Sequence, residues 1–148
     1  MQLRNAVLQM QAEIVPGIGS NTIRGIGIDL VHLPRITALL QRKPAYRLKF
    51  PGRILHEHEL LRYQDHVSNE EKSTLFLGRC WAIKEALYKS LDAPRQKAFE
   101  FKDWCTVDKT GPRPIIKNFD LNDEERFLVS VTHDGEYVVA VVVRDKAS

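Results

Sequence analysis

The feature that most constrains this chain is one long amphipathic helix, which begins at a capping signal and ends before a proline. Ser68 and Glu71 match the S-x-x-E capping box, in which two side chains satisfy free backbone N–H groups of the first helical turn. The helix is predicted to run to about residue 91, and Pro94 closes the region. Residues at helical spacing form its buried stripe: Phe76, Cys80, Ile83, Leu87 and Leu91. The chain has 148 residues, enough for one domain with a core.

Strand patterns lie on both sides of this helix in the sequence. Residues 23–31 alternate as a strand before it. Four strand-like segments follow it: residues 99–107, 115–116, 127–132 and 136–143. The last two are joined through residues 133–135, where Asp-Gly is a tight-turn signal. Shorter helices are predicted at residues 34–41 and in the second half of residues 50–64. This order predicts an α+β fold, with an antiparallel sheet packed on one long helix.

Residues 1–22 are predicted to be an N-terminal extension, and residues 23–148 one domain. The extension has no secretory pattern. Arg4 and Arg24, with Glu13 as the only acid between them, are compatible with a weak mitochondrial presequence, and the segment is also compatible with a disordered tail. The longest apolar run, residues 137–143, is far shorter than the roughly 20 residues that cross a bilayer. We therefore expect no membrane partner.

Positive charge is concentrated in one segment. The formal net charge is only +3, but no acidic residue lies between Asp29 and Glu57. The segment contains six basic residues: Arg35, Arg42, Lys43, Arg47, Lys49 and Arg53. Such a segment would attract an acidic partner, and the plain alternative is a solvated basic face.

The cysteines and a histidine cluster do not predict a metal site. Cys80 and Cys105 have neither CxxC nor Cys/His spacing, so we expect them to be buried as small apolar residues. Residues 56–59 read His-Glu-His-Glu, which does not match HExxH. Because adjacent helical residues point in different directions, we interpret this cluster as part of the surface.

One carboxylate stands on an unusual strand. In segment 23–31, Ile26, Ile28 and Leu30 share one face, whereas the other face carries Gly25, Gly27, Asp29 and Val31. A glycine within a strand often marks a place where a ligand or another backbone comes close. A simple bulge with an exposed aspartate at its end is the alternative.

The long helix carries a second carboxylate. Glu85 and Lys89 are one turn apart, and small residues, Gly78 and Ala82, share their face, so a ligand can approach closely. A surface ion pair between Glu85 and Lys89 is the plain alternative. With Asp29, Glu85 could share Mg²⁺, which takes one or two protein carboxylates together with water and substrate phosphate. Three basic residues of the helix would supply charge for that phosphate: Arg79, Lys84 and Lys89.

Three motifs give these residues a specific resemblance. Residues 25–31, Gly-Ile-Gly-Ile-Asp-Leu-Val, resemble the opening G-[IL]-G-x-D-[IL]-V of the holo-acyl-carrier-protein synthase family of 4'-phosphopantetheinyl transferases. Residues 76–89 resemble its second signature, F-L-A-x-R-[FW]-A-x-K-E-A-x-x-K. Residues 129–134 resemble its closing V-S-[IL]-[ST]-H strand. The match covers roughly residues 23–143, with the motifs in the right order and at about the right separation.

The resemblance implies an enzyme that transfers 4'-phosphopantetheine from coenzyme A to a serine of an apo acyl carrier protein, supporting fatty acid synthesis. Asp29 and Glu85 would bind Mg²⁺ with the coenzyme A pyrophosphate. The serine attacks the phosphorus bearing the pantetheine arm, and 3',5'-ADP leaves. Glu85 is the candidate base, and Lys89 stabilises charge on the phosphates. The implied contacts with coenzyme A phosphates are Arg79, Lys84, Lys89 and His133.

The resemblance also implies a quaternary structure and a protein partner. The family fold is the 4'-phosphopantetheinyl transferase-like fold, assembled as a homotrimer with active sites at subunit interfaces. Acyl carrier proteins are acidic, which gives the basic segment a partner. The implied docking residues are Arg35, Arg42, Arg47 and Arg53.

Some departures from the bacterial pattern suggest a branch of the family. Many bacterial members have a histidine just before the closing motif, where this chain has Leu128. They also have a glycine-rich phosphate loop after the second signature, where this chain has residues 90–96. Arg95 or Lys97 could replace the contacts of that loop. These features resemble the fungal mitochondrial branch, so we expect the mitochondrial matrix, or the cytoplasm if the chain is bacterial.

Two other functions fit parts of the sequence. A small module that binds RNA or an acidic protein without catalysis would explain the basic segment. Only Tyr46 and Phe50 interleave with its charges, however, so we expect no nucleic-acid partner. Another metal-dependent phosphotransferase or nuclease could use the same two carboxylates, and selectivity for coenzyme A over free nucleotides would distinguish it.

Overall fold

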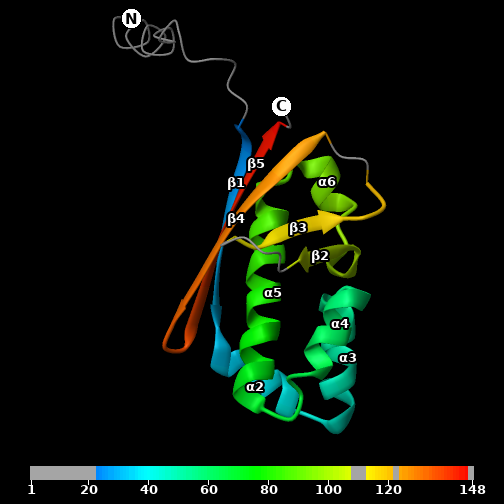
Figure 1. Cartoon of the computed structure of the whole chain (residues 1–148), viewed down its shortest axis with the longest axis vertical. Helices are drawn as coiled ribbons and strands as arrows, with labels where there is room; N and C mark the ends of the chain where they lie inside the picture. The colour runs from blue at the N-terminus through cyan, green and yellow to red at the C-terminus, as the bar shows by residue number, and fades with distance from the viewer. Residues whose placement is uncertain (1–22, 108–112, 122–123, 147–148) are drawn as a thin grey trace, which may run out of the picture.

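A three-stranded antiparallel sheet and one long helix form the centre of the molecule (Figure 1). A computed structural model describes residues 23–107, 113–121 and 124–146. Strands β1 (Ile23–His32), β5 (Tyr137–Lys146) and β4 (Glu125–Asp134) pair in that order. Helix α5 (Glu70–Ser90) lies along one face of this sheet (Figure 1). The predicted α+β fold, with an antiparallel sheet packed on one long helix, is confirmed.

The cap of α5 differs in detail from the predicted one. Asn69, not Ser68, is the N-cap residue, and its side chain accepts a hydrogen bond of 2.9 Å from the Lys72 backbone N–H. Burial extends round most of the helix rather than along one stripe, because Ala82, Lys84 and Ala86 are fully buried as well. A helix that is covered on several sides has to have neighbours other than the sheet.

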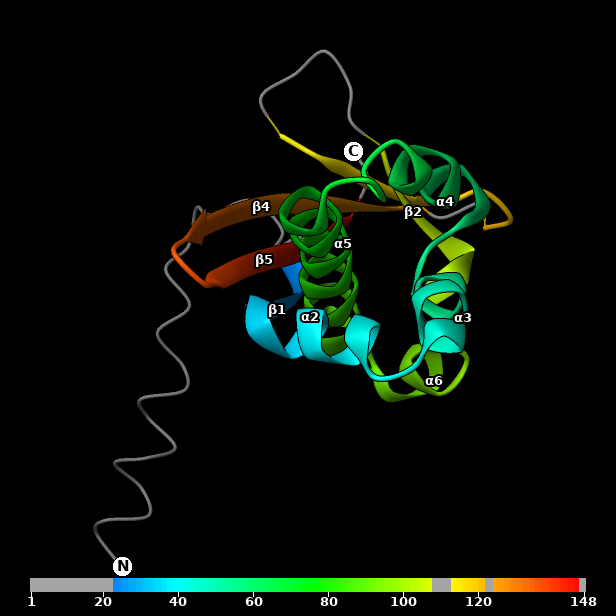
Figure 2. The ribbon, with the colours of Figure 1, turned by 90° about the horizontal axis from the view of Figure 1, so that it is seen from below.

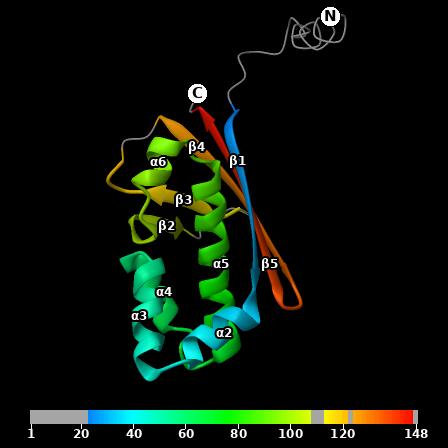
Figure 3. The same cartoon turned by 180° about the vertical axis from the view of Figure 1, so that it is seen from behind.

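Those neighbours are short elements on the side of α5 that faces away from the sheet (Figures 2 and 3). The chain passes from β1 through three helices: α2 (Leu33–Gln41), α3 (Pro44–Ile54) and α4 (Glu57–Gln64). After α5 come α6 (Ala93–Lys97), the 3₁₀ turn η1 (Phe101–Asp103), and strands β2 (Trp104–Val107) and β3 (Ile115–Asn118). β2 and β3 pair antiparallel, as predicted for residues 115–116.

Three predicted boundaries were wrong. The first half of residues 50–64 is helical as well, because α3 begins at Pro44, where proline suits a first helical turn. The strand predicted at 99–107 is only Trp104–Val107, since η1 precedes it. His133 and Asp134 belong to β4 rather than to the turn.

Composition suggests that the apolar face of β1 is buried and its glycine face exposed, but the structure shows the reverse. Its apolar face is open: Ile26, Ile28 and Leu30 are 62%, 59% and 60% exposed. Its glycine face packs on α5, where a Cβ on Gly27 would lie 1.8 Å from the Ala86 carbonyl oxygen. A Cβ on Gly25 would lie 2.1 Å from the Ser90 carbonyl oxygen. The glycines therefore allow direct contact between two backbones, which favours the predicted close approach over a simple bulge with an exposed aspartate.

Three further expectations concern single features. Cys80 and Cys105 are free and buried, as predicted. Within the described residues, no helix combines the length and the apolar character that a membrane crossing requires. The expected N-terminal extension, residues 1–22, lies outside the described residues.

Candidate active site

Asp29 and Lys89 meet where β1 runs along α5. Asp29 is on the glycine face of β1, so its carboxylate points toward the helix. The Lys89 Nζ atom donates hydrogen bonds to Asp29 Oδ1 at 2.8 Å and to the Ile28 carbonyl oxygen at 3.1 Å. The Asp29 side chain is 13% exposed and that of Lys89 47%. The site is thus a carboxylate held at the edge of the core, with an ammonium group that solvent can reach.

Glu85 faces the same place from one turn earlier on α5. Burial raises its pKa, the nearby Asp29 carboxylate raises it further, and Lys89 lowers it. Lys89, one turn after Glu85 on the same face of α5, contacts Asp29, so the two acids share one neighbourhood although they come from different elements. A carboxyl with a raised pKa beside a second carboxylate is a frequent feature of catalytic sites.

The oxygen ligands of this site fit a hard divalent cation. The described residues hold no cluster of three or more His, Cys, Asp or Glu side chains that could bind a metal. Two carboxylates are nevertheless the usual protein contribution to Mg²⁺ when a substrate phosphate supplies further oxygens. A cationic group, Lys89 Nζ, already pairs with Asp29, which shows that positive charge is favourable there.

An aromatic cluster packs around Trp81 of α5. Trp81 and Tyr88 lie one turn before and after Glu85 on α5. Trp81 contacts Phe50 of α3 and Phe101 of η1, with ring centroids 5.5 and 5.8 Å apart. No local pattern joins residues 50, 81 and 101, so the sequence could not reveal this group.

The structure does not bring Lys84 to the site, and its predicted contact with phosphate is wrong. Lys84 is fully buried, and its Nζ atom lies 2.5 Å from Glu59 Oε2 and 2.7 Å from the Ile54 carbonyl oxygen. Because successive helical residues project about 100° apart, Lys84 points away from the face of Glu85. The interpretation of residues 56–59 as surface is also wrong for Glu59, which is fully buried.

Arg79 and His133 are not beside the two carboxylates in a single chain. Arg79 lines a small pocket with Thr106 and Pro114. His133 lines another cavity with Thr74 near the start of α5. Thr74 and Glu85 are about 16 Å apart along the helix axis, at ~1.5 Å per residue. Matched position by position, the arginine of the second signature falls at Cys80, which is buried, and not at Arg79.

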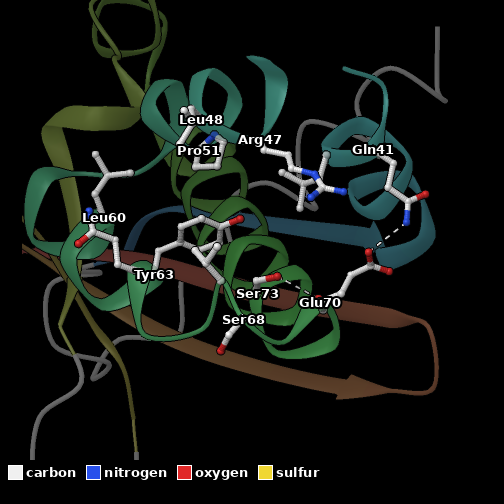
Figure 4. A pocket seen from close by; sticks show the side chains of 12 residues that line it. Gln41, Arg47, Leu48, Pro51, Leu60, Tyr63, Ser68, Glu70 and Ser73 are labelled. Carbon is white, nitrogen blue, oxygen red and sulfur yellow. Dashed lines mark hydrogen bonds between the residues drawn. The ribbon is translucent and has the colours of Figure 1, made fainter. Parts of the chain in front are cut away.

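The four proposed docking arginines are all exposed, on or next to α2 and α3. Arg35 is in α2, Arg42 follows it, and Arg47 and Arg53 are in α3. Arg47 also lines a cavity of about 290 Å³ between α3, α4 and the start of α5, which Figure 4 shows from close by. Arg95 pairs with Glu125 of β4, and Lys97 is exposed.

Fold and site together define a small α+β protein with two acids and one lysine where a strand meets the long helix, a set of groups suited to a divalent cation and a phosphate. The family model of the 4'-phosphopantetheinyl transferase superfamily matches residues 25–142, so the chain belongs to that superfamily. A holo-[acyl-carrier-protein] synthase of Staphylococcus carnosus is 35% identical over 84% of this chain and 98% of that protein.

Two further relatives are informative. A mitochondrial holo-[acyl-carrier-protein] synthase of Eremothecium gossypii is 32% identical over 84% of this chain and 80% of that protein. The crystal structure of a holo-(acyl-carrier-protein) synthase from Bacillus anthracis, in complex with CoA (3',5'-ADP), superposes with a TM-score of 0.70. It is 30% identical and covers 84% of this chain and 98% of that one.

Proposed function

We propose that this chain transfers the 4'-phosphopantetheine group of coenzyme A to a serine of an apo acyl carrier protein, releases 3',5'-ADP, and so supports fatty acid synthesis. The observation that carries the proposal is the meeting of Asp29, Glu85 and Lys89 from β1 and α5. Relatives named holo-acyl-carrier-protein synthases, and a related structure with coenzyme A, support it.

The chemistry follows from the protonation and charge of the three side chains. Glu85, when ionised, accepts the proton of the attacking serine hydroxyl. The new bond forms between that oxygen and the phosphorus bearing the pantetheine arm, and the bond from this phosphorus to the bridging oxygen breaks. The electron pair leaves with 3',5'-ADP. Lys89, which is half exposed and within 2.8 Å of Asp29, can pair with phosphate oxygens as charge shifts to the leaving group.

We include Mg²⁺ in this proposal, held by Asp29 and Glu85. Their two carboxylates, drawn from separate elements and coupled in charge, support it. When bound, Mg²⁺ supplies neutralisation of negative charge on the pyrophosphate.

The chain is proposed to act as a homotrimer. The exposed apolar face of the sheet supports this. Ile26, Ile28 and Leu30 of β1 lie on that face. Leu128 of β4, 40% exposed, extends it, because Leu128 pairs with Val143 of β5 and Val143 pairs with Ile26. Contiguous exposed apolar residues mark interaction surfaces. Subunit contacts of this kind would also allow His133 to reach the carboxylates of a neighbouring copy.

The proposed carrier-protein surface is the basic side of α2 and α3. Arg35 lies six residues after Asp29, at the start of α2, so a docked carrier would have its serine close to the carboxylates. Arg42, Arg47 and Arg53 extend the positive surface from there. We place the protein in the mitochondrial matrix, supported by the mitochondrial relative, with the cytoplasm as the alternative.

The test is the intact mass of a purified apo acyl carrier protein after incubation with this chain, coenzyme A and Mg²⁺. A gain of one phosphopantetheine arm that EDTA abolishes, and that Glu85→Gln abolishes too, is the expected result. No gain with several carrier proteins, from folded enzyme, would overturn the proposal and favour a binding module without catalysis. Transfer that survives EDTA would overturn the metal's part alone.

A further inference from the structure

A buried ion pair lies on another side of α5, about 100° round the helix from Glu85. Lys84 and Glu59 are both 0% exposed, and the distance from Lys84 Nζ to Glu59 Oε2 is 2.5 Å. The same ammonium donates to the Ile54 carbonyl oxygen at the end of α3. Glu59 Oε1 accepts from both the backbone N–H and the hydroxyl of Thr106 in β2, each at 2.6 Å. One ion pair thus connects α3, α4, α5 and β2.

Stability alone does not explain such a pair. Removing two opposite charges from water costs free energy that their attraction barely recovers, so well-packed apolar residues of similar size are often as stable. What a buried, fully hydrogen-bonded pair provides and apolar packing does not is direction, because its hydrogen bonds tolerate little sliding or rotation. Lys84 has two such bonds and Glu59 several, including one from the His56 backbone N–H to Oε2.

The ion pair is next in sequence to a residue of the site. Lys84 precedes Glu85, so the bonds that fix the direction of Lys84 also fix the rotation of α5 that aims Glu85 at Asp29. On the sheet side, Gly25 and Gly27 offer α5 a bare backbone, and the hydrogen bonds there come from Lys89, a half-exposed side chain, to Asp29 and Ile28. A rotation of α5 by about 20° would move a side-chain end roughly 2 Å at a radius of ~6 Å. A misplacement of about 1 Å can reduce a rate ~100-fold.

We infer that Lys84 and Glu59 are positioning residues, which hold Glu85 against Asp29 by fixing the rotation of α5. This inference rests on the proposed function. Neither side chain touches substrate, and each acts only through the helix.

The central variant replaces the pair without leaving a buried charge: Lys84→Met with Glu59→Gln. Its matched control is Leu77→Ala, which removes a fully buried side chain from the same helix but leaves the pair intact. Three quantities are compared with the native chain: the free energy of unfolding in urea, kcat and KM per folded molecule, and the affinity for Mn²⁺ as a Mg²⁺ probe by electron paramagnetic resonance. Mn²⁺ affinity reports on the carboxylates without requiring transfer.

The expected result is a double variant that unfolds cooperatively, has a kcat at least tenfold lower at similar KM for the carrier protein, and binds Mn²⁺ at least fivefold more weakly. Leu77→Ala loses stability but keeps kcat and Mn²⁺ affinity within twofold. A double variant with native kcat and Mn²⁺ affinity would overturn the inference. If the native chain itself neither transfers the arm nor binds Mn²⁺, the proposed function fails instead.

A milder variant keeps the inference testable if the double variant does not fold. Thr106→Val removes only the hydroxyl donor to Glu59 Oε1 and preserves side-chain shape. We expect kcat to fall two- to fivefold, together with Mn²⁺ affinity. A loss of stability with unchanged kcat and unchanged Mn²⁺ affinity would show that the pair serves the core alone, and would overturn the inference.

Discussion

Gly27→Ala is the sharpest test of how β1 and α5 build the site. The new Cβ would lie 1.8 Å from the Ala86 carbonyl oxygen and 2.8 Å from the Ser90 backbone nitrogen. Both are backbone atoms of α5, so no rotamer change can relieve the contact. Reaching even a tight 3.0 Å contact requires the two backbones to separate by about 1.2 Å. The buried ion pair on another side of α5 resists that movement.

The magnitude follows from this displacement. Overpacking of a well-packed core destabilises by about 1–3 kcal/mol, and contact with backbone favours the upper end. A loss of about 3 kcal/mol lowers the Tm of a chain of this size by roughly 6–12 °C. Because Asp29 is two residues from Gly27 and Glu85 precedes Ala86, the shift also separates the two carboxylates. We expect kcat per folded molecule to fall by about 100-fold.

The assay pairs thermal unfolding with the rate of holo carrier formation, measured by intact mass. Gly52→Ala is the control, because its Cβ would meet nothing within 4 Å and it lies inside α3. That variant should be more stable by about 0.5–1 kcal/mol, since alanine has the higher helix propensity, and equally active. A Gly27→Ala protein that melts within a degree of the native chain and keeps its kcat would refute the account of the glycine face.

Three further predictions concern the site and the sheet. Glu85→Gln should abolish transfer yet raise the free energy of unfolding at neutral pH. In the native chain, burial and Asp29 raise the folded pKa of Glu85, so its ionised form opposes folding above that pKa, and this penalty disappears below the unfolded pKa. Urea unfolding across pH checks this, and a less stable variant would contradict it. kcat/KM, which reports ionisations of the free enzyme, should fall as pH is lowered through that raised pKa, and a flat acidic limb in the pH profile of kcat/KM would exclude Glu85 as the base. Ile28→Asp, on the exposed apolar face, should leave the fold intact and lower the mass measured by sedimentation to that of one subunit, whereas an unchanged mass would exclude this face as the interface.

Much of the fold follows from local patterns, because α5 and β1 are set by capping, periodicity and alternation. What the alternation of β1 cannot reveal is which face is buried. Ile26 and Ile28 are more apolar than Gly25 and Gly27, yet the glycines face the helix. The reason is steric, since only a face without side chains admits another backbone.

The site was predictable only where its residues share a motif or a helix face. Asp29, Glu85 and Lys89 belong to two short motifs, and the structure brings Lys89 to Asp29. Lys84 belongs to the same motif, but its partner Glu59 is on another helix, and helical spacing gives no information about that distance. The same holds for His133, which lies on β4 and lines a cavity with residues at the start of α5.

The two faces of β1 have a consequence for how mutations along it would be tolerated. Residues 25, 27, 29 and 31 act within a single subunit, through contact with α5 and through the carboxylate. Residues 26, 28 and 30 are open to solvent and available to another molecule. A saturation scan across β1 should therefore show an alternation in the kind of defect rather than in its severity. Every second position would be insensitive to enzyme concentration, and those between would be rescued by raising it.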